Sequence, residues 1–110
     1  MRINTLKENE YHVIGIEGDL DASSSIQLDQ AIEEAVANGE TKIIVDCSAL
    51  EYISSAGLGV FMSYIHDFQE KNISLVLCHL SEKVKNVFQI LGLDELIKIS
   101  NTKEEAKTID

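Results

Sequence analysis

The sequence predicts an α/β domain in which a small mixed β-sheet is flanked by α-helices. The apolar residues change repeatedly between a period of two and a period of 3.6, which indicates strands alternating with helices. The 110 residues have the length of one domain, and neither a linker nor a repeat divides them. Apolar residues make up 45% of the chain and charged residues 25%, as in ordinary globular domains. We therefore expect one domain over residues 1–110, with the element order β-β-α-β-α-β-α-β-α.

Alternating apolar residues predict the first two strands, over residues 3–6 and 11–18, with a polar turn between them. Side chains of the second strand alternate between two faces: His12, Ile14 and Ile16 on one, Tyr11 and Val13 on the other. A loop is expected at residues 18–21.

The first predicted helix follows this loop. Ser24 and Gln27 have the spacing of a capping box, in which two side chains satisfy free N–H groups at a helix start. Apolar residues at helical spacing then form one face: Leu28, Ala31, Ile32, Ala35 and Val36. Gly39 suits the position just past the helix end. The short apolar run at residues 43–45 predicts a central strand.

The second half of the chain continues the alternation. A second helix opens at residues 54–56, with an apolar stripe of Leu58, Phe61, Met62, Ile65 and Phe68. Residues 75–78 predict a buried strand. A third helix, closed by Gly92, has an apolar stripe of Val84, Val87, Phe88 and Leu91. Residues 97–99 suit a short edge strand, and Thr102 with Glu105 predicts the start of a last helix containing Ala106 and Ile109.

Charge and composition exclude several classes of function. The chain has 9 Lys and Arg against 19 Asp and Glu, a formal net charge of −10, which disfavours nonspecific nucleic-acid binding and attraction to anionic membranes. No apolar run approaches the ~18 residues of a transmembrane helix, and no signal peptide is visible. Cys47 and Cys78 lie in apolar runs, as buried thiols of a reducing compartment do. We expect a cytoplasmic protein.

The most informative stretch covers residues 43–59. A strand is expected to end on Asp46, and a loop containing Ser48 follows it. Two serines, Ser54 and Ser55, then open a helix, where free N–H groups and the helix dipole favour anions such as a phosphoryl group. A serine at this place can also be simply a helix cap. Two glycines, at positions 57 and 59, leave room for the backbone of a partner.

This stretch resembles the signature of STAS domains, specifically that of the anti-sigma factor antagonists. The resemblance is carried by Asp-x-Ser at residues 46–48, by Ile53 and Ser54, and by Ser-Ala-Gly-Leu-Gly at residues 55–59. A second match, Gly-Asp-Leu-Asp at residues 18–21, is similar to the turn after the second strand of that family. The order of elements and the length agree as well, so the resemblance covers essentially the whole chain.

The resemblance implies a small mixed sheet flanked by helices and a role in partner switching. Such proteins bind an anti-sigma factor that is also a serine kinase, and so release a sigma factor. The kinase phosphorylates one serine, and a metal-dependent serine phosphatase removes the phosphate. Ser55 matches the acceptor. Ser54 is the alternative, because many relatives have Asp at its place. The residues expected to bind the partner are Asp21, Asp46, Ser48, Ser54, Ser55, Gly57, Gly59 and Met62.

No cofactor or metal is expected. His12, His66 and His79 lack metal-ligand spacing, and the adjacent pair of Cys78 and His79 does not make a tetrahedral site by itself. Ile53 stands where a nucleophile elbow needs its first glycine, so the chain is not expected to be an enzyme. A monomer or a weak dimer is expected.

Two other functions remain open at this point. The chain also resembles stand-alone STAS subunits, which serve as scaffolds on the ATPase of lipid-transport complexes. Asp46 with the acidic pair Asp19 and Asp21 suggests a receiver domain phosphorylated on Asp46, because receivers bind Mg²⁺ with clustered carboxylates. The acidic pair, however, follows the second strand instead of the first, which disfavours the receiver.

Overall fold

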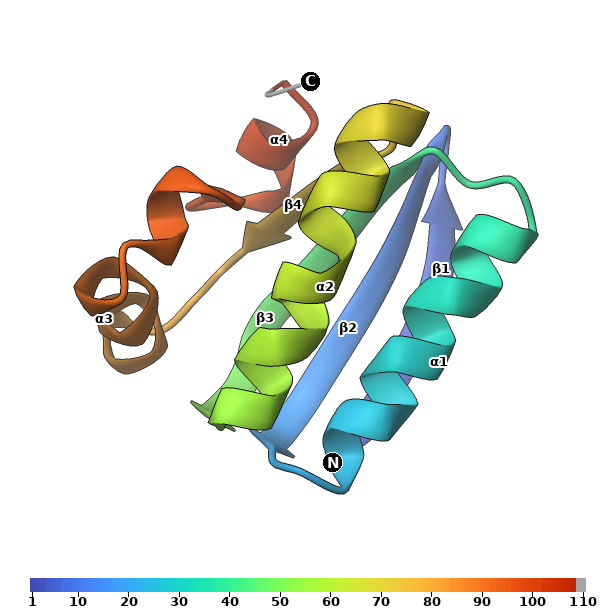
Figure 1. The fold of residues 1–110 in the computed structure, drawn as a ribbon. Helices are drawn as coiled ribbons and strands as arrows, with labels where there is room; N and C mark the ends of the chain where they lie inside the picture. The colour runs from blue at the N-terminus through green and yellow to red at the C-terminus, as the bar shows by residue number, and fades with distance from the viewer. Residues whose placement is uncertain (109–110) are drawn as a thin grey trace.

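The computed structural model describes residues 1–108, which fold into a five-stranded sheet with helices packed against it (Figure 1). The predicted α/β class and the order of the elements are confirmed. Ile109, predicted to belong to the last helix, lies outside the described residues. The elements are β1 (Arg2–Glu8), β2 (Tyr11–Leu20), α1 (Ser24–Ala37), β3 (Lys42–Ile53), α2 (Ser55–Lys71), β4 (Ser74–Cys78), α3 (Glu82–Ile90), the short 3₁₀ helix η1 (Leu93–Glu95), β5 (Lys98–Ser100) and α4 (Lys103–Ala106).

The sheet is mixed, as predicted. Its strands follow chain order, β1-β2-β3-β4-β5. The hairpin strands β1 and β2 are antiparallel, whereas β2, β3, β4 and β5 are parallel neighbours. Parallel neighbours need crossover connections, which α1, α2 and α3 provide. The third crossover leads through α3 and η1 to β5, the predicted edge strand, which begins one residue later than expected.

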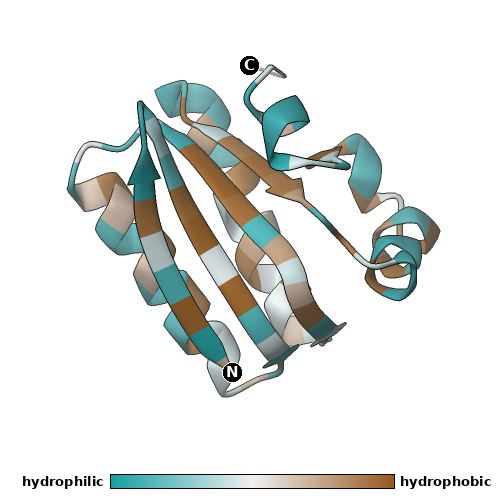
Figure 2. Cartoon of the chain, turned by 180° about the vertical axis from the view of Figure 1, so that it is seen from behind, coloured by the Kyte–Doolittle hydropathy of each residue, from teal (hydrophilic) through white to brown (hydrophobic). Residues whose placement is uncertain are grey.

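The two faces of the sheet are covered unequally. Helices α1, α2 and α3 pack on one face, over a core that contains the buried rings of Phe61 and Phe88 (Figure 1). The short helix α4 packs on the opposite face (Figure 2). There Ala106 joins a smaller cluster of Val13, Ile44, Val76 and Cys78. The predicted alternation in β2 is confirmed, because Ile14 and Ile16 belong to the main core and Val13 to the smaller cluster.

Most helix ends follow the predicted residues. Gly39 and Gly92 adopt left-handed backbone, with φ of 85° and 72°, just past α1 and α3. The Thr102 hydroxyl accepts a hydrogen bond from the Glu105 N–H at 3.1 Å and caps α4. One expectation is wrong: Leu91 follows the end of α3 and is 57% exposed, so it does not belong to the buried stripe.

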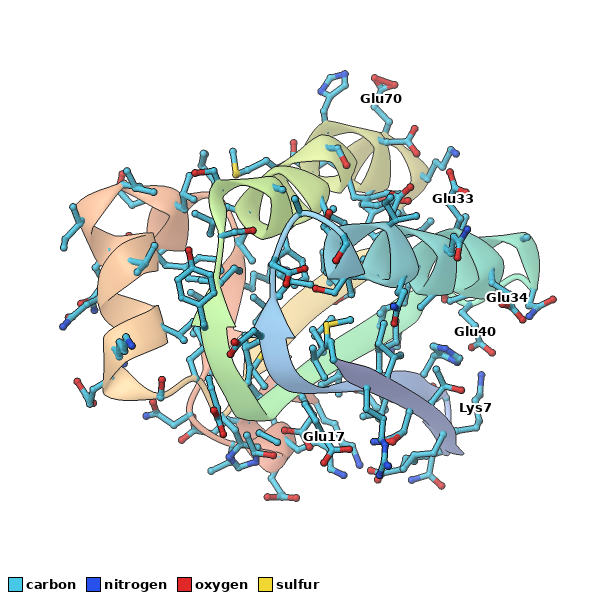
Figure 3. All side chains as sticks on the ribbon, turned by 90° about the horizontal axis from the view of Figure 1, so that it is seen from below. Lys7, Glu17, Glu33, Glu34, Glu40 and Glu70 are labelled. Atoms are coloured by element: carbon cyan, nitrogen blue, oxygen red, sulfur yellow. The ribbon has the colours of Figure 1, made fainter. Side chains whose placement is uncertain are left out.

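Several acidic side chains of the helix layer lie in solvent. Glu33 and Glu34 of α1 and Glu70 of α2 point away from the core (Figure 3). Lys7 of β1 pairs with Glu40, which follows α1, and so links the edge strand to the helix layer. No helix among residues 1–108 combines the length and the apolar character needed to cross a membrane.

The two central strands are longer than predicted. The strand expected at residues 43–45 is β3, which runs from Lys42 to Ile53, and β2 continues to Leu20 through the predicted loop. Beyond Asp46, β3 pairs with β2 alone, because β4 ends opposite Asp46. Two register shifts, each with one extra residue in β3, let the pairing continue although the apolar alternation is interrupted.

Candidate functional site

The candidate site lies where β2 and β3 end together. Leu20 is the register partner of Ile53, and the next N–H, that of Ser54, donates to the Leu20 carbonyl at 2.9 Å. Each strand is followed closely by a helix, so α1 and α2 both begin at this edge of the sheet (Figure 1). The carboxyl ends of parallel strands are the usual place for functional groups in α/β sheets.

Ser54 is the cap of α2. Its backbone is extended, and its hydroxyl oxygen accepts a hydrogen bond from the Gly57 N–H at 3.2 Å. Its carbonyl accepts the first helical hydrogen bond, from Leu58, at 3.0 Å. The structural role that sequence reasoning considered for a serine here therefore belongs to Ser54.

Ser55 is the first residue of α2, and it is exposed. Its backbone N–H is among those that have no acceptor within the helix, at the positive end of the helix dipole. The two adjacent serines therefore differ: Ser54 is half-buried with its oxygen engaged, whereas Ser55 is directed toward solvent.

Asp21 fixes the start of α1. Its carboxylate oxygen Oδ1 accepts hydrogen bonds from the Ser24 N–H and the Ser24 hydroxyl, both at 2.9 Å, and from the Ser23 hydroxyl at 3.0 Å. The backbone bond from Ser24, followed by the two hydroxyl bonds, lowers the pKa of Asp21 to about 2. In return, the Asp21 N–H donates to the Ser24 hydroxyl at 2.8 Å. The reciprocal capping pair is thus Asp21 with Ser24, and the predicted pair of Ser24 with Gln27 is wrong.

The two glycines of the motif have different surroundings. Gly57 is buried, and a Cβ at its position would lie 2.7 Å from Leu20 Cγ and 3.1 Å from Ile53 Cγ1. This glycine allows α2 to approach the ends of β2 and β3, so it has a packing role, and its role as a partner contact stays a prediction. Gly59 is exposed, and a Cβ there would meet nothing within 4 Å.

The predicted strand end at Asp46 and the predicted loop at Ser48 are both wrong. Both residues are inside β3, where the Ser48 N–H donates to the Asp46 carboxylate at 3.0 Å. Ile53, at the end of β3, is seven positions after Asp46, which is roughly 20 Å along a strand. The strand continues because β2 pairs with it beyond Asp46, so this carboxylate is remote from the serines.

The Asp46 side chain instead lies near Cys78 and His79, which follow it by about thirty positions in the sequence. One ligand atom each from Asp46, Cys78 and His79 lies within 4.8 Å of the others. Both cysteines are free and buried, as predicted. Burial first, and the nearby carboxylate of Asp46 second, raise the pKa of the Cys78 thiol to about 12.

Two further residues extend the exposed surface around Ser55. Met62 lies on α2, seven residues after Ser55 and hence on nearly the same side of the helix, and it is half-buried. Tyr52, at the end of β3, is 47% exposed. Sequence reasoning missed Tyr52, although a large aromatic side chain two residues before a helix cap at a strand end is a usable signal.

Comparison with known proteins identifies the family. The family model of the STAS domain matches residues 2–106. The chain belongs to the STAS domain family. The resemblance seen at residues 18–21 and 46–59 is therefore confirmed, and so is the STAS-like fold.

Named relatives of this STAS domain are anti-sigma factor antagonists. The chain is 32% identical over 91 residues to the protein named putative anti-sigma factor antagonist BtrV of Bordetella bronchiseptica, and the match covers 83% of this chain and 78% of that protein. It is 27% identical over 99 residues to the anti-sigma-B factor antagonist of Listeria monocytogenes, with 90% and 87% covered. The solved structure of the Bacillus cell fate determinant SpoIIAA in its phosphorylated form is similar with a TM-score of 0.72 and 26% identity, over 97% of each chain.

Proposed function

We propose that this STAS domain is an anti-sigma factor antagonist that is switched by phosphorylation of Ser55. In the unphosphorylated form it binds an anti-sigma factor that is also a serine kinase, and so releases a sigma factor. The kinase phosphorylates Ser55 and ends the complex, and a metal-dependent serine phosphatase restores it. In this role the chain is a regulatory binding protein of the cytoplasm and not an enzyme.

The observation that carries the proposal is the division of roles between Ser54 and Ser55. A kinase needs a hydroxyl that can leave its surroundings and enter an active site. The Ser54 oxygen caps α2 through the Gly57 N–H, whereas Ser55 is exposed at the first position of the helix. Phosphorylating Ser54 requires loss of the cap, so Ser55 is the favoured acceptor and Ser54 the alternative.

The proposed partner surface is the exposed side around the start of α2. It comprises Ser55 and Gly59, with Met62 and Tyr52 at its borders, and Asp21 beside it where β2 ends. Gly59 leaves the helix backbone accessible because no neighbouring atom occupies the space of its missing Cβ. Gly57 lies beneath this surface and packs against the ends of β2 and β3. Asp46 and Ser48 are not part of the surface.

The electrostatics of the site explain how a phosphate could end binding without refolding the domain. Phosphorylation adds about −1.5 to −2 charges, and the start of α2 tolerates them because its N–H groups are free. The surroundings are acidic, since Asp19 and Asp21 lie at the same strand end and the net charge is already −10. A partner surface that fits a neutral hydroxyl would have to desolvate a dianion, which lowers affinity by a factor of ~10² or more.

Phosphosite mapping tests the acceptor directly. The chain is incubated with the candidate kinase and ATP, and the product is mapped by mass spectrometry. We expect one acid-stable phosphate on Ser55, which is lost in Ser55→Ala and retained in Ser54→Ala. A phosphate that remains in Ser55→Ala, or one that acid removes, would contradict the proposal.

A binding assay tests the switch separately. Ser55→Glu places negative charge at the start of α2, and Gln89→Glu places it at an exposed position of α3 as a matched control. We expect Ser55→Glu to weaken kinase binding by a factor of ~10 or more and Gln89→Glu to leave it unchanged. Equal affinities for Ser55→Glu and wild type would refute the switch.

The other two functions find less support in the site. A receiver domain needs converging carboxylates, but Asp46 is the register partner of Gly15 whereas Asp19 is that of Tyr52, six positions further along β3. No contact of the described residues favours a transport scaffold over an antagonist. Affinity capture that recovers a transporter ATPase instead of a kinase would support the scaffold.

A further inference from the structure

Three side chains with metal-binding atoms lie together where the β3–β4 pairing ends, at the last residue of β4. Asp46 and Cys78 are register partners on neighbouring parallel strands, so their side chains lie on the same face of the sheet. His79 follows Cys78 directly and has left-handed backbone with φ of 60°, which is uncommon for a residue other than glycine. The ligand atoms of all three residues lie within 4.8 Å of one another.

We propose that Asp46, Cys78 and His79 form a binding site for Zn²⁺. A thiolate, an imidazole and a carboxylate are the three protein ligands that Zn²⁺ accepts in tetrahedral sites, with a water molecule in the fourth position. Ligand atoms around Zn²⁺ are about 3.5 Å apart, given bond lengths of about 2.0–2.3 Å. The present separations, all within 4.8 Å, therefore need to shorten by no more than about 1.3 Å. His79 lies in the connection between β4 and α3, where a small movement does not disturb the sheet.

The surroundings of the three ligands are compatible with a cation. The Ser48 N–H donates to the Asp46 carboxylate at 3.0 Å, and such outer hydrogen bonds orient metal ligands. The nearby cation, Lys103, acts electrostatically on Asp46 and Cys78, but its ammonium group pairs with Glu8 at 2.7 Å. Binding replaces the Cys78 thiol proton, which passes to solvent, so a Zn–S bond forms as the S–H bond breaks.

This site is separate from the proposed phosphorylation site. Asp46 is roughly 20 Å along β3 from the strand end next to Ser55. Zn²⁺ would join β3, β4 and the connection to α3, and would leave the exposed side of α2 accessible. The test of the Zn²⁺ site is therefore independent of the proposed phosphorylation of Ser55.

Titration of the intact chain with Co²⁺ as a spectroscopic probe for Zn²⁺ tests the site. We expect one Co²⁺ per chain with a thiolate-to-cobalt charge-transfer band, which Zn²⁺ abolishes by displacement. Asp46→Asn and His79→Ala should weaken binding by about tenfold or more, since each removes one of three ligands. Cys78→Ser should remove the band, with circular dichroism confirming that this buried substitution leaves the fold intact.

Two variants serve as matched controls. Cys47→Ser removes the other buried thiol, and His66→Ala removes an exposed imidazole that pairs with Glu70 at 2.8 Å and could bind metal adventitiously. Both should keep the charge-transfer band and the affinity of the wild type. Absence of the band at saturating Co²⁺, or a band that persists at full affinity in both Asp46→Asn and His79→Ala, would overturn the proposal.

Discussion

Replacing Gly57 with alanine tests how α2 is seated on the sheet. The added Cβ would lie 2.7 Å from Leu20 Cγ, 2.8 Å from Leu20 Cδ2 and 3.1 Å from Ile53 Cγ1. Carbon atoms in contact are normally about 3.5–4.0 Å apart, so the helix and the two side chains must separate by up to about 1 Å. Leu20 is fully buried and Ile53 is 6% exposed, so neither side chain can turn into solvent to make room.

The expected loss of stability follows from these distances. Overpacking of a well-packed core typically costs about 1–3 kcal/mol, and alanine recovers at most about 1 kcal/mol through its higher helix propensity. Gly57→Ala should therefore lower the free energy of unfolding by about 1–2 kcal/mol. For a domain of this size that corresponds to a decrease in Tm of about 5–10 °C.

Gly59→Ala is the matched control, because it makes the same chemical change two residues further along the helix. Nothing lies within 4 Å of its added Cβ, so alanine should raise the stability by about 0.5–1 kcal/mol. Urea and thermal unfolding followed by circular dichroism measure both variants. A Gly57→Ala variant as stable as wild type, or a Gly59→Ala variant that is the less stable of the two, would refute the packing role of Gly57.

Three other predictions concern hydrogen bonds at the starts of α1 and α2 and between these two helices. Ser54→Ala should lower the unfolding free energy by about 1 kcal/mol because it removes the cap of α2, whereas Ser55→Ala should change it by less than about 0.5 kcal/mol in the same urea assay. The pKa of Asp21 is lower in the folded protein, about 2, than in the unfolded chain, 3.8, so its ionised carboxylate stabilises the fold above pH 3.8 and this stabilisation is lost as the pH falls toward about 2. In thermal unfolding across that pH range, Tm should therefore decrease less in Asp21→Asn than in wild type. Tyr64→Phe should cost about 1–2 kcal/mol in thermal unfolding, because it removes the 2.5 Å hydrogen bond to the Asp29 carboxylate that links α1 to α2; a loss below about 0.5 kcal/mol would contradict this.

The sequence predicts the elements well where burial is one-sided and regular. The stripe of Leu28, Ile32 and Ala35 and the glycine at position 39 define α1 almost to the residue, because helical spacing and a left-handed end are local properties. The extension of β3 to Ile53 could not be predicted in the same way. It depends on pairing with β2 across two register shifts, which is a property of two distant segments.

The candidate site shows the same limit. The serines at the start of α2 can be found from the sequence, because a cap and a helix start are local features. A carboxylate at the end of an apolar run usually ends a strand, so the sequence predicts that the strand ends at Asp46, before the loop that leads to the serines. In the structure Asp46 lies inside β3 and next to Cys78, which is 32 positions later in the sequence. This neighbourhood depends on the register of β3 with β4, which no local spacing in the sequence predicts.

Neighbouring residues in the first turn of α2 have separate structural roles, and our proposal that Ser55 is a switch rests on this separation. Ser54 holds the helix start through the Gly57 N–H, and Gly57 holds the helix against Leu20 and Ile53. Ser55 takes part in neither contact, so a phosphate on it adds charge without removing a cap or opening the core. A modification that leaves the fold intact must act on whatever contacts the surface. In our proposal the phosphate therefore acts through the contact between the start of α2 and the partner.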